Sequence, residues 1–106
     1  MEKIRLGLSN LEVSVVGLGC MRMASKNITE AVAVVQAALD AGINFFDHAD
    51  IYGKGQSEII FGHAMRELKL DRESIIIQSK CGINQTEGTF DYSKDYILES
   101  VDGILE

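Results

Sequence analysis

The sequence lacks proline, has only two cysteines, and carries fewer basic than acidic residues over its 106 positions. The absence of proline, whose average usage is about 5%, points to no particular function. Cys20 and Cys81 lack the paired spacing of a zinc site, and two cysteines are too few for a disulfide scaffold. We therefore expect two reduced thiols in a cytoplasmic protein.

Charge and hydropathy exclude further classes. A net charge of −6 argues against a nucleic-acid or anionic-membrane surface, although a few local donors would still hold a nucleotide cofactor. No apolar run approaches the roughly 20 residues of a membrane span, and the N-terminus has no apolar segment typical of a signal peptide. No His, Cys and carboxylate cluster has metal-ligand spacing, so we predict no metal site.

Hydrophobic periodicity predicts a hairpin followed by alternating strands and helices. We expect the hairpin over residues 3–15, with its turn at Ser9-Asn10. The predicted strands cover residues 15–19, 43–46 and 74–79, and the predicted helices cover 27–41, 58–68 and a segment that begins after Ser93. Strands that alternate with helices form parallel sheets with right-handed crossovers, so the fold class is α/β.

Local signals set the expected boundaries of these elements. Asn27 with Glu30 predicts a capped helix start, and Gly42 predicts its end. The near-continuous apolar strand at 15–19 is expected to be covered on both faces, and residues 83–92 are expected to form a polar loop. Six apolar residues are expected on the buried side of the second helix: Ile59, Ile60, Phe61, Ala64, Met65 and Leu68.

An acid, a phenol and an amine follow the second and third predicted strands. Asp47 and Tyr52 lie in the run 45–53, and Lys80 directly follows the strand at 74–79. The carboxyl ends of parallel strands meet at one edge, where ligand chemistry belongs. A tyrosine is a poor acid at neutral pH, but an ammonium beside it stabilises the phenolate, and a carboxylate keeps that ammonium charged. The three together predict a proton donor for carbonyl reduction.

Each residue also has a simpler interpretation. Asp47 alone would most often be a turn residue, and Tyr52 alone would most often be a packing residue. Lys80 is less ordinary, because a lysine directly after a buried strand is expected to be paired or functional. His48 could tune the site or simply hydrogen-bond to the backbone, and we favour the backbone bond; we expect His63 on the surface or in packing.

Together these residues carry a family resemblance. The pattern Phe46-Asp47-x-Ala49-x-x-Tyr52-Gly53, followed by Ser57-Glu58 and Ser79-Lys80, resembles the aldo-keto reductases over essentially the whole chain. A bacterial oxidoreductase branch of that family is the most similar. The resemblance implies an α/β fold made of an N-terminal hairpin and the first three βα units of a TIM (β/α)8 barrel. Residues 1–106 would then be one incomplete, truncated part of a barrel domain.

The resemblance implies NADPH-dependent reduction of aldehydes or ketones, with Asp47, Tyr52 and Lys80 as catalytic residues. It places the cofactor against Asp47 and the loop Gly19-Cys20-Met21-Arg22. From the residues alone, Met21 and Arg22 could equally be rim packing and a solvated charge. The family's fourth catalytic residue, a histidine, and most of its phosphate-binding groups belong to later strands, so we expect the isolated chain to be inactive.

Two alternatives remain open. The chain could be a non-catalytic binding or regulatory module, since potassium-channel β-subunits share this fold. It could also be an inactive partial barrel that associates with itself. Three parallel strands leave two open sheet edges, and we expect the inner sheet face to expose apolar residues from the runs 15–16, 45–46 and 75–77. We therefore expect self-association or pairing with the remainder of a barrel, and a small carbonyl substrate.

Overall fold

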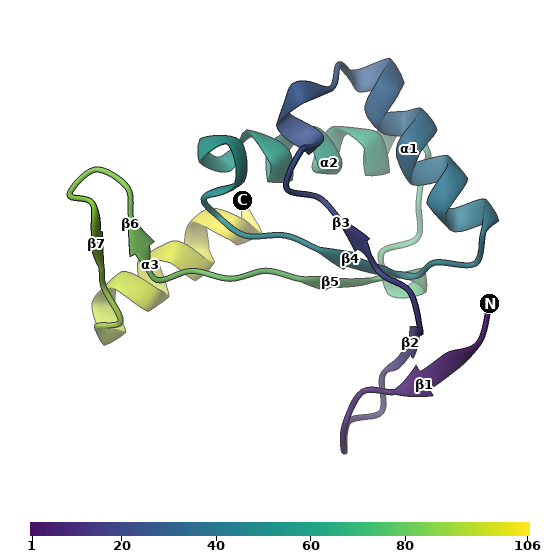
Figure 1. The fold of residues 1–106 in the computed structure, drawn as a ribbon, viewed down its shortest axis with the longest axis horizontal. Helices are drawn as coiled ribbons and strands as arrows, with labels where there is room; N and C mark the ends of the chain where they lie inside the picture. Colours follow the sequence, from purple (N-terminus) through teal and green to yellow (C-terminus); the bar gives the residue numbers. More distant parts are fainter.

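The computed structural model describes residues 1–106, and its chain order is a hairpin followed by alternating strands and helices (Figure 1). The strands are β1 Lys3–Arg5, β2 Glu12–Ser14, β3 Leu18–Gly19, β4 Phe45–Asp47, β5 Ile76–Gln78, β6 Ile83–Asn84 and β7 Thr89–Phe90. The α-helices are α1 Ile28–Asp40, α2 Gln56–Glu67 and α3 Lys94–Leu105, and the 3-10 helices are η1 Met23–Ser25, η2 Tyr52–Gly55 and η3 Arg72–Ser74.

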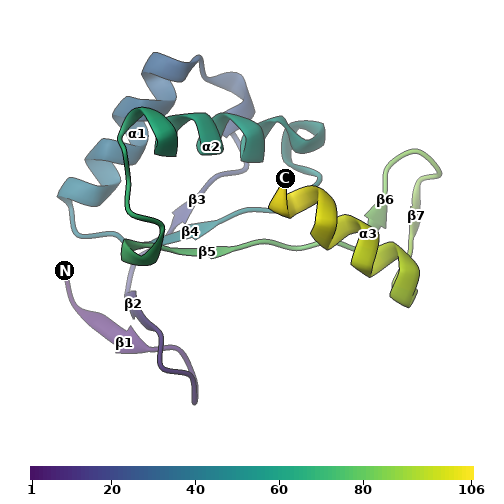
Figure 2. The same cartoon turned by 180° about the vertical axis from the view of Figure 1, so that it is seen from behind.

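The central layer is a parallel three-stranded sheet in the order β3-β4-β5. Helices α1 and α2 lie together over one face of this sheet, as Figure 2 shows from behind. Parallel strands joined by helices on one face are the arrangement that the alternating sequence pattern predicts. The predicted hairpin is confirmed as β1 paired with β2, with Ile4 opposite Val13.

The core lies between the sheet and these two helices. Nine buried side chains form it: Cys20, Met23, Ala31, Val35, Ala38, Phe46, Phe61, Ala64 and Ile75. The aromatic rings of Phe46 and Phe61 pack at 5.1 Å between centroids. This contact joins β4 to α2 and fixes the helix over the strand that carries the candidate acid.

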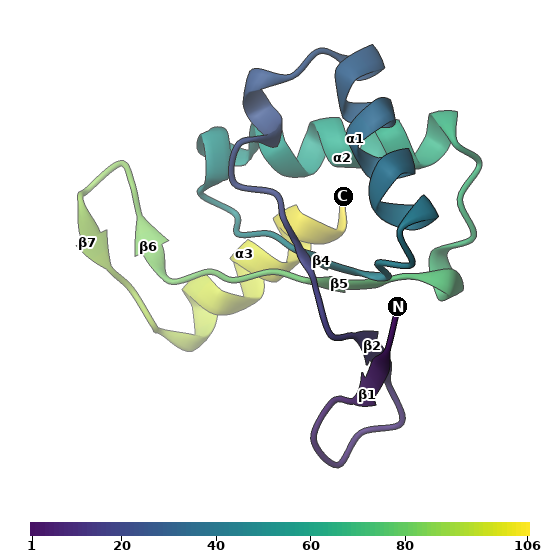
Figure 3. The same cartoon turned by 45° about the vertical axis from the view of Figure 1, so that its right-hand side comes forward.

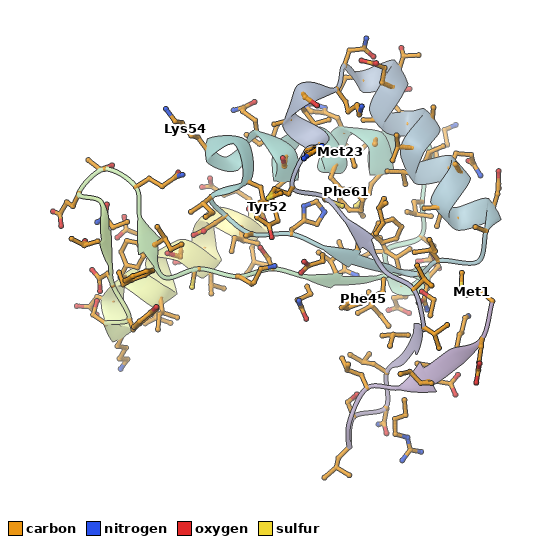
Figure 4. All side chains as sticks on the ribbon, in the orientation of Figure 1. Met1, Met23, Phe45, Tyr52, Lys54 and Phe61 are labelled. Atoms are coloured by element: carbon orange, nitrogen blue, oxygen red, sulfur yellow. The ribbon has the colours of Figure 1, made fainter.

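Successive residues of β4 point to opposite faces of the sheet. Phe46 is fully buried beneath the helices, whereas Phe45 lies on the opposite face (Figure 4). A Cβ at Gly17 would approach the Phe45 ring to 2.8 Å, so the glycine makes room for that ring. Phe46 and Ile75 are therefore core residues, and Phe45 is the residue of this run that the open face carries.

The first long helix has the predicted ends. The Asn27 side chain accepts a hydrogen bond from the Glu30 amide at 2.8 Å, and the Glu30 carboxylate accepts one from the Asn27 amide at 3.1 Å. This capping box satisfies amides that have no partner inside the helix. Gly42 follows the helix with φ +87, a conformation that strains any residue with a Cβ. Both boundary signals are confirmed.

The strand predicted at 15–19 is shorter than expected. Strand β3 contains only Leu18 and Gly19, and Val15 and Val16 are each about half exposed, at 48% and 50%. The prediction of coverage on both faces is wrong for these valines. The Val15 amide donates to the Glu2 carbonyl at 3.0 Å, so this part of the segment still belongs to the hairpin before the chain reaches the sheet.

The second helix and third strand also differ from their predicted limits. Helix α2 begins at Gln56 rather than residue 58, directly after the turn η2, and Ile59 is 51% exposed rather than buried. Ile59 lines a groove of about 760 Å³ between α2 and α3. Strand β5 begins only at Ile76, because η3 occupies the preceding residues.

The loop predicted at 83–92 contains a short hairpin, β6 paired with β7, that projects beyond the sheet (Figure 3). The Asn84 side chain accepts a hydrogen bond from the Glu87 amide at 3.1 Å, and Gly88 takes φ +67. These turn features supply the hairpin geometry that polarity alone did not reveal.

Helix α3 starts as predicted but packs loosely. The Ser93 hydroxyl accepts a hydrogen bond from the Tyr96 amide at 3.3 Å, which caps the helix. The helix has no buried residue, and four of its large apolar side chains are exposed: Ile97, Leu98, Val101 and Leu105. None of the three α-helices is long and apolar enough to cross a membrane.

Candidate active site

The candidate residues gather at the carboxyl ends of the three parallel strands. Gly19 of β3 pairs with Asp47 of β4, and Asp47 pairs with Gln78 of β5. Lys80 lies two residues beyond Gln78, on the same side of the chain. The strand register therefore brings the predicted acid and the predicted amine to one place.

Lys80 and Asp47 form a direct ion pair. The Lys80 Nζ donates to Asp47 Oδ1 at 2.7 Å and to the His48 carbonyl oxygen at 2.6 Å. The two side chains are 46% and 33% exposed, so the pair is open to an incoming molecule. The hydrogen bond to the His48 carbonyl holds the ammonium at the end of β4. The second carboxylate oxygen of Asp47 has no hydrogen-bond partner in the protein.

The pair keeps both groups ionised. The hydrogen bond from Lys80 lowers the pKa of Asp47 below its usual value, and a further bond from Gln78 Nε2 at 2.7 Å acts in the same direction. Partial burial alone would lower the pKa of Lys80, but the hydrogen bonds and charges of Asp47 and Tyr52 outweigh it and raise that pKa. An ammonium of this kind persists throughout the neutral range.

Tyr52 lies beside the same ammonium. The Lys80 Nζ is 5.2 Å from the centroid of the Tyr52 ring, within the range of a cation–π contact. Tyr52 opens the turn η2, and its amide donates to the Ala49 carbonyl at 3.1 Å. The structure thus brings together Asp47, Lys80 and Tyr52, the three residues predicted to be catalytic.

The predicted cofactor loop divides into exposed and buried parts. Nothing lies within 4 Å of the position that a Cβ would take on Gly19, so the space beside Asp47 is open. Met21 is 57% exposed and Arg22 is also exposed. Cys20 is buried, and burial followed by the charge of Asp47 raises the pKa of its thiol to about 12. The thiol of Cys20 therefore lies out of reach of a ligand, and its backbone amide and carbonyl are bonded to Asp47 and Met23.

His48 does not make the backbone hydrogen bond that we expected. Its ring is 1% exposed, neither ring nitrogen has a hydrogen-bond partner, and the ring packs edge-on against Phe61 at 4.5 Å. The side chain follows Asp47 and so points to the opposite, helix-covered face of the sheet. Burial lowers the pKa of His48 to about 4, which keeps the ring neutral at pH 7.

Comparisons with known proteins place the chain in a family. The Aldo/keto reductase family model matches residues 15–106. The chain belongs to the aldo-keto reductase family. It is 38% identical to the uncharacterized oxidoreductase YqkF of Bacillus subtilis over 105 residues, which is 95% of this chain and 33% of that protein.

Two further members show the range of relatives. An aldo-keto reductase from Bacillus halodurans, solved in its holo form, superposes with a TM-score of 0.85 at 38% identity, over 99% of this chain and 35% of that one. A probable voltage-gated potassium channel subunit beta from Oryza sativa is 35% identical over 100% of this chain and 33% of its own length. The chain spans about a third of the length of these curated relatives.

Two contacts in this aldo-keto reductase chain were missed by the sequence reasoning. Gln78 supports Asp47, and strand periodicity could have suggested it, because Gln78 and Lys80 are two residues apart and share a face. The Ser79 hydroxyl donates to Glu58 Oε2 at 2.9 Å, which ties the end of β5 to α2. No sequence signal paired these last two residues, since they lie 21 positions apart.

Proposed function

We propose that this chain is the N-terminal part of an NADPH-dependent oxidoreductase that reduces aldehydes or ketones to alcohols in the cytoplasm. The observation that carries this proposal is the Lys80 ammonium, held 2.7 Å from Asp47 and 5.2 Å from the Tyr52 ring. In the same proposal, residues 1–106 form one uninterrupted part of a (β/α)8 barrel: its leading hairpin and first three βα units.

Each side chain of the site has a separate role in protonating the oxygen of the substrate carbonyl. Tyr52 holds a proton at its hydroxyl and gives it to that oxygen as the alcohol forms. Lys80 stabilises the phenolate that this transfer leaves. Asp47 holds Lys80 ionised and oriented, and Gln78 in turn holds Asp47.

The residues present support a site for one end of the cofactor. Nothing lies within 4 Å of a Cβ placed on Gly19, Asp47 is 33% exposed, and Met21 and Arg22 in the loop after β3 are exposed. When bound there, the nicotinamide supplies the hydride. The groups that would hold the phosphates are expected from other parts of a complete barrel.

The reductase proposal is tested by following NADPH absorbance with a generic aldehyde. A polypeptide that carries these residues within a complete barrel should turn over, and Tyr52→Phe should abolish the turnover. The isolated 106-residue chain should show no rate above the background without enzyme. Tyr52-dependent turnover by the isolated chain would refute the expectation of inactivity, and no turnover by the complete barrel would refute the reductase function.

A regulatory module is the second candidate, and the identity of 35% to a channel β-subunit is the observation that favours it. Saturable binding to a purified potassium-channel domain, combined with no turnover by the complete barrel, would support this alternative. The third candidate, an inactive partial barrel, depends on association of its open sheet with a second copy or with the remainder of a barrel.

A further inference from the structure

Ser57 links the loop after β3 to the start of α2. Its side chain is 0% exposed. The hydroxyl accepts a hydrogen bond from the Ala24 amide at 3.0 Å and donates one to the Met21 carbonyl at 3.3 Å. One buried hydroxyl thus satisfies two backbone groups of the loop 21–24, which borders the candidate cofactor region.

The turn that carries Tyr52 touches the same loop. A Cβ on Gly53 would overlap the Ala24 Cβ, closer than non-bonded carbon atoms can approach. Only glycine therefore allows the turn to reach Ala24. The loop 21–24 is held from two sides, by the Ser57 hydroxyl and by the backbone next to Tyr52.

The backbone of this turn adopts left-handed conformations that contacts from the rest of the chain can stabilise. Gly53, Lys54 and Gly55 all have positive φ values, of 58°, 55° and 91°. Lys54 is not a glycine, so its left-handed conformation is disfavoured in isolation. Contacts from outside the segment are needed to keep a turn of this kind in one conformation.

We infer that Ser57 is a positioning residue for Tyr52, and that its hydroxyl holds the loop 21–24 against the turn η2. The phenol and the exposed side chains of the loop then keep a fixed separation across the site. This inference rests on the proposed function only in assigning Tyr52 the role of proton donor. Its structural part, the coupling of Ser57 to Tyr52, is independent of turnover.

Tyrosine labelled with carbon-13 at Cζ provides a direct readout in the 106-residue chain. Tyr52→Phe assigns the Tyr52 signal, and the Tyr92 and Tyr96 signals are internal references for folding. Ser57→Ala should shift the Tyr52 signal and leave the references unchanged, whereas Ser57→Thr, which keeps the hydroxyl, should return it toward the wild-type position. A Tyr52 signal that Ser57→Ala leaves unchanged would overturn the inference.

A second pair of variants covers the case in which Ser57→Ala fails to fold. Gly53→Ala should shift the Tyr52 signal by pushing against Ala24, and adding Ala24→Gly should restore it, because the second change removes the opposing carbon. If Gly53→Ala leaves the Tyr52 signal in place, the loop does not position the turn and the inference fails.

Turnover measurements on a complete barrel distinguish this inference from the proposed function. In a complete, active barrel, Ser57→Ala should lower kcat by roughly ten- to a hundredfold, as small displacements of reacting groups do, and Ser57→Thr should recover most of it. An inactive wild type would refute the reductase proposal, while the tyrosine signals would still decide the role of Ser57. An active wild type matched by Ser57→Ala would refute only the inference.

Discussion

The sheet with α1 and α2 differs sharply in packing from the two hairpins and α3. All nine residues of the core cluster lie between Cys20 and Ile75, whereas α3 has no buried residue. The total accessible surface is 7165 Å², against about 5,800 Å² expected for a compact protein of this mass. The radius of gyration is 14.5 Å, where about 13 Å would be ordinary.

The candidate catalytic residues belong to the well-packed region and not to the two hairpins or α3. Asp47 ends β4 and Lys80 follows β5, both strands of the well-packed region, and Tyr52 lies in the turn between β4 and α2. The ion pair is therefore positioned by elements that share one core. The large apolar side chains of α3 are instead exposed. The following predictions test the difference between the two regions, from the largest expected effect to the smallest.

Lys80→Met should have the largest effect on turnover and only a small effect on stability. In a complete barrel we expect kcat to fall by roughly 100-fold or more, because proton transfer from a positioned acid contributes about 10²–10⁴. Stability should change by less than about 1 kcal/mol, since an exposed ion pair contributes little. Steady-state kinetics at pH 7 and urea unfolding measure the two effects.

The matched control for this experiment is Lys80→Arg. It keeps the charge but replaces a compact ammonium with a planar guanidinium, so it should retain stability and recover part of the turnover. Wild-type turnover by Lys80→Met would remove Lys80 from the mechanism. A large loss of stability would instead show that the site and the core are not separate.

His48 should make the core sensitive to acid. Its pKa is about 4 in the folded chain and about 6.5 when unfolded, so between these values the unfolded state binds more protons. The free energy of unfolding should therefore fall as pH drops below about 6.5, by on the order of 3 kcal/mol in total near pH 4. Urea unfolding at several pH values measures the slope.

One variant isolates this contribution. His48→Leu should flatten the slope, and the difference from wild type cancels the carboxyl groups that titrate in the same window. Equal slopes for wild type and His48→Leu would show that the His48 ring is solvated rather than buried neutral.

The same substitution, phenylalanine to leucine, should change the free energy of unfolding by different amounts in the well-packed core and in the β6–β7 hairpin. Phe46→Leu removes buried ring atoms and should lower the free energy of unfolding by about 1–2 kcal/mol. Phe90→Leu changes a side chain that is 72% exposed on β7 and should alter it by no more than about 0.5 kcal/mol. Comparable losses in urea unfolding would mean that the β6–β7 hairpin is packed more firmly than its exposure indicates.

The sequence allowed the element order to be predicted because its signals are local. Capping at Asn27 and Ser93, the stop at Gly42 and the apolar runs each depend on a few neighbouring residues. Element lengths were less accessible, since the ends of β3 and β5 depend on which neighbours lie beside them. The β6–β7 hairpin escaped detection because two-residue strands carry almost no periodic signal.

The candidate site was also predictable in part. Asp47, Tyr52 and Lys80 were identified from strand ends and a family pattern, and the structure places them together. Strand alternation could have indicated the face on which His48 lies, but no face was predicted, and the missing hydrogen bonds of its ring depend on the packing of Phe61. The contacts of Ser57 with the loop 21–24 span more than 30 residues, and only the fold brings them together.

The smallest expected effect concerns self-association of the chain, and not its stability or its turnover. At micromolar concentration the 106-residue chain should sediment as more than one species, because β3 and β5 each leave an unpaired edge. The excess surface of roughly 1,300 Å² over a compact monomer exceeds the roughly 800 Å² per partner that a stable interface buries.

Paired variants can locate the surface responsible. Leu98→Ser acts on the exposed face of α3, and Val16→Ser acts beside the open edge of β3. Each should leave unfolding nearly unchanged, because both residues are about half exposed, and the variant that raises the monomer fraction identifies the contact. A wild type that sediments as one monomeric species, unfolds cooperatively and binds no apolar dye would show that the well-packed region suffices without any cover, and that the exposed face of α3 has no partner in solution.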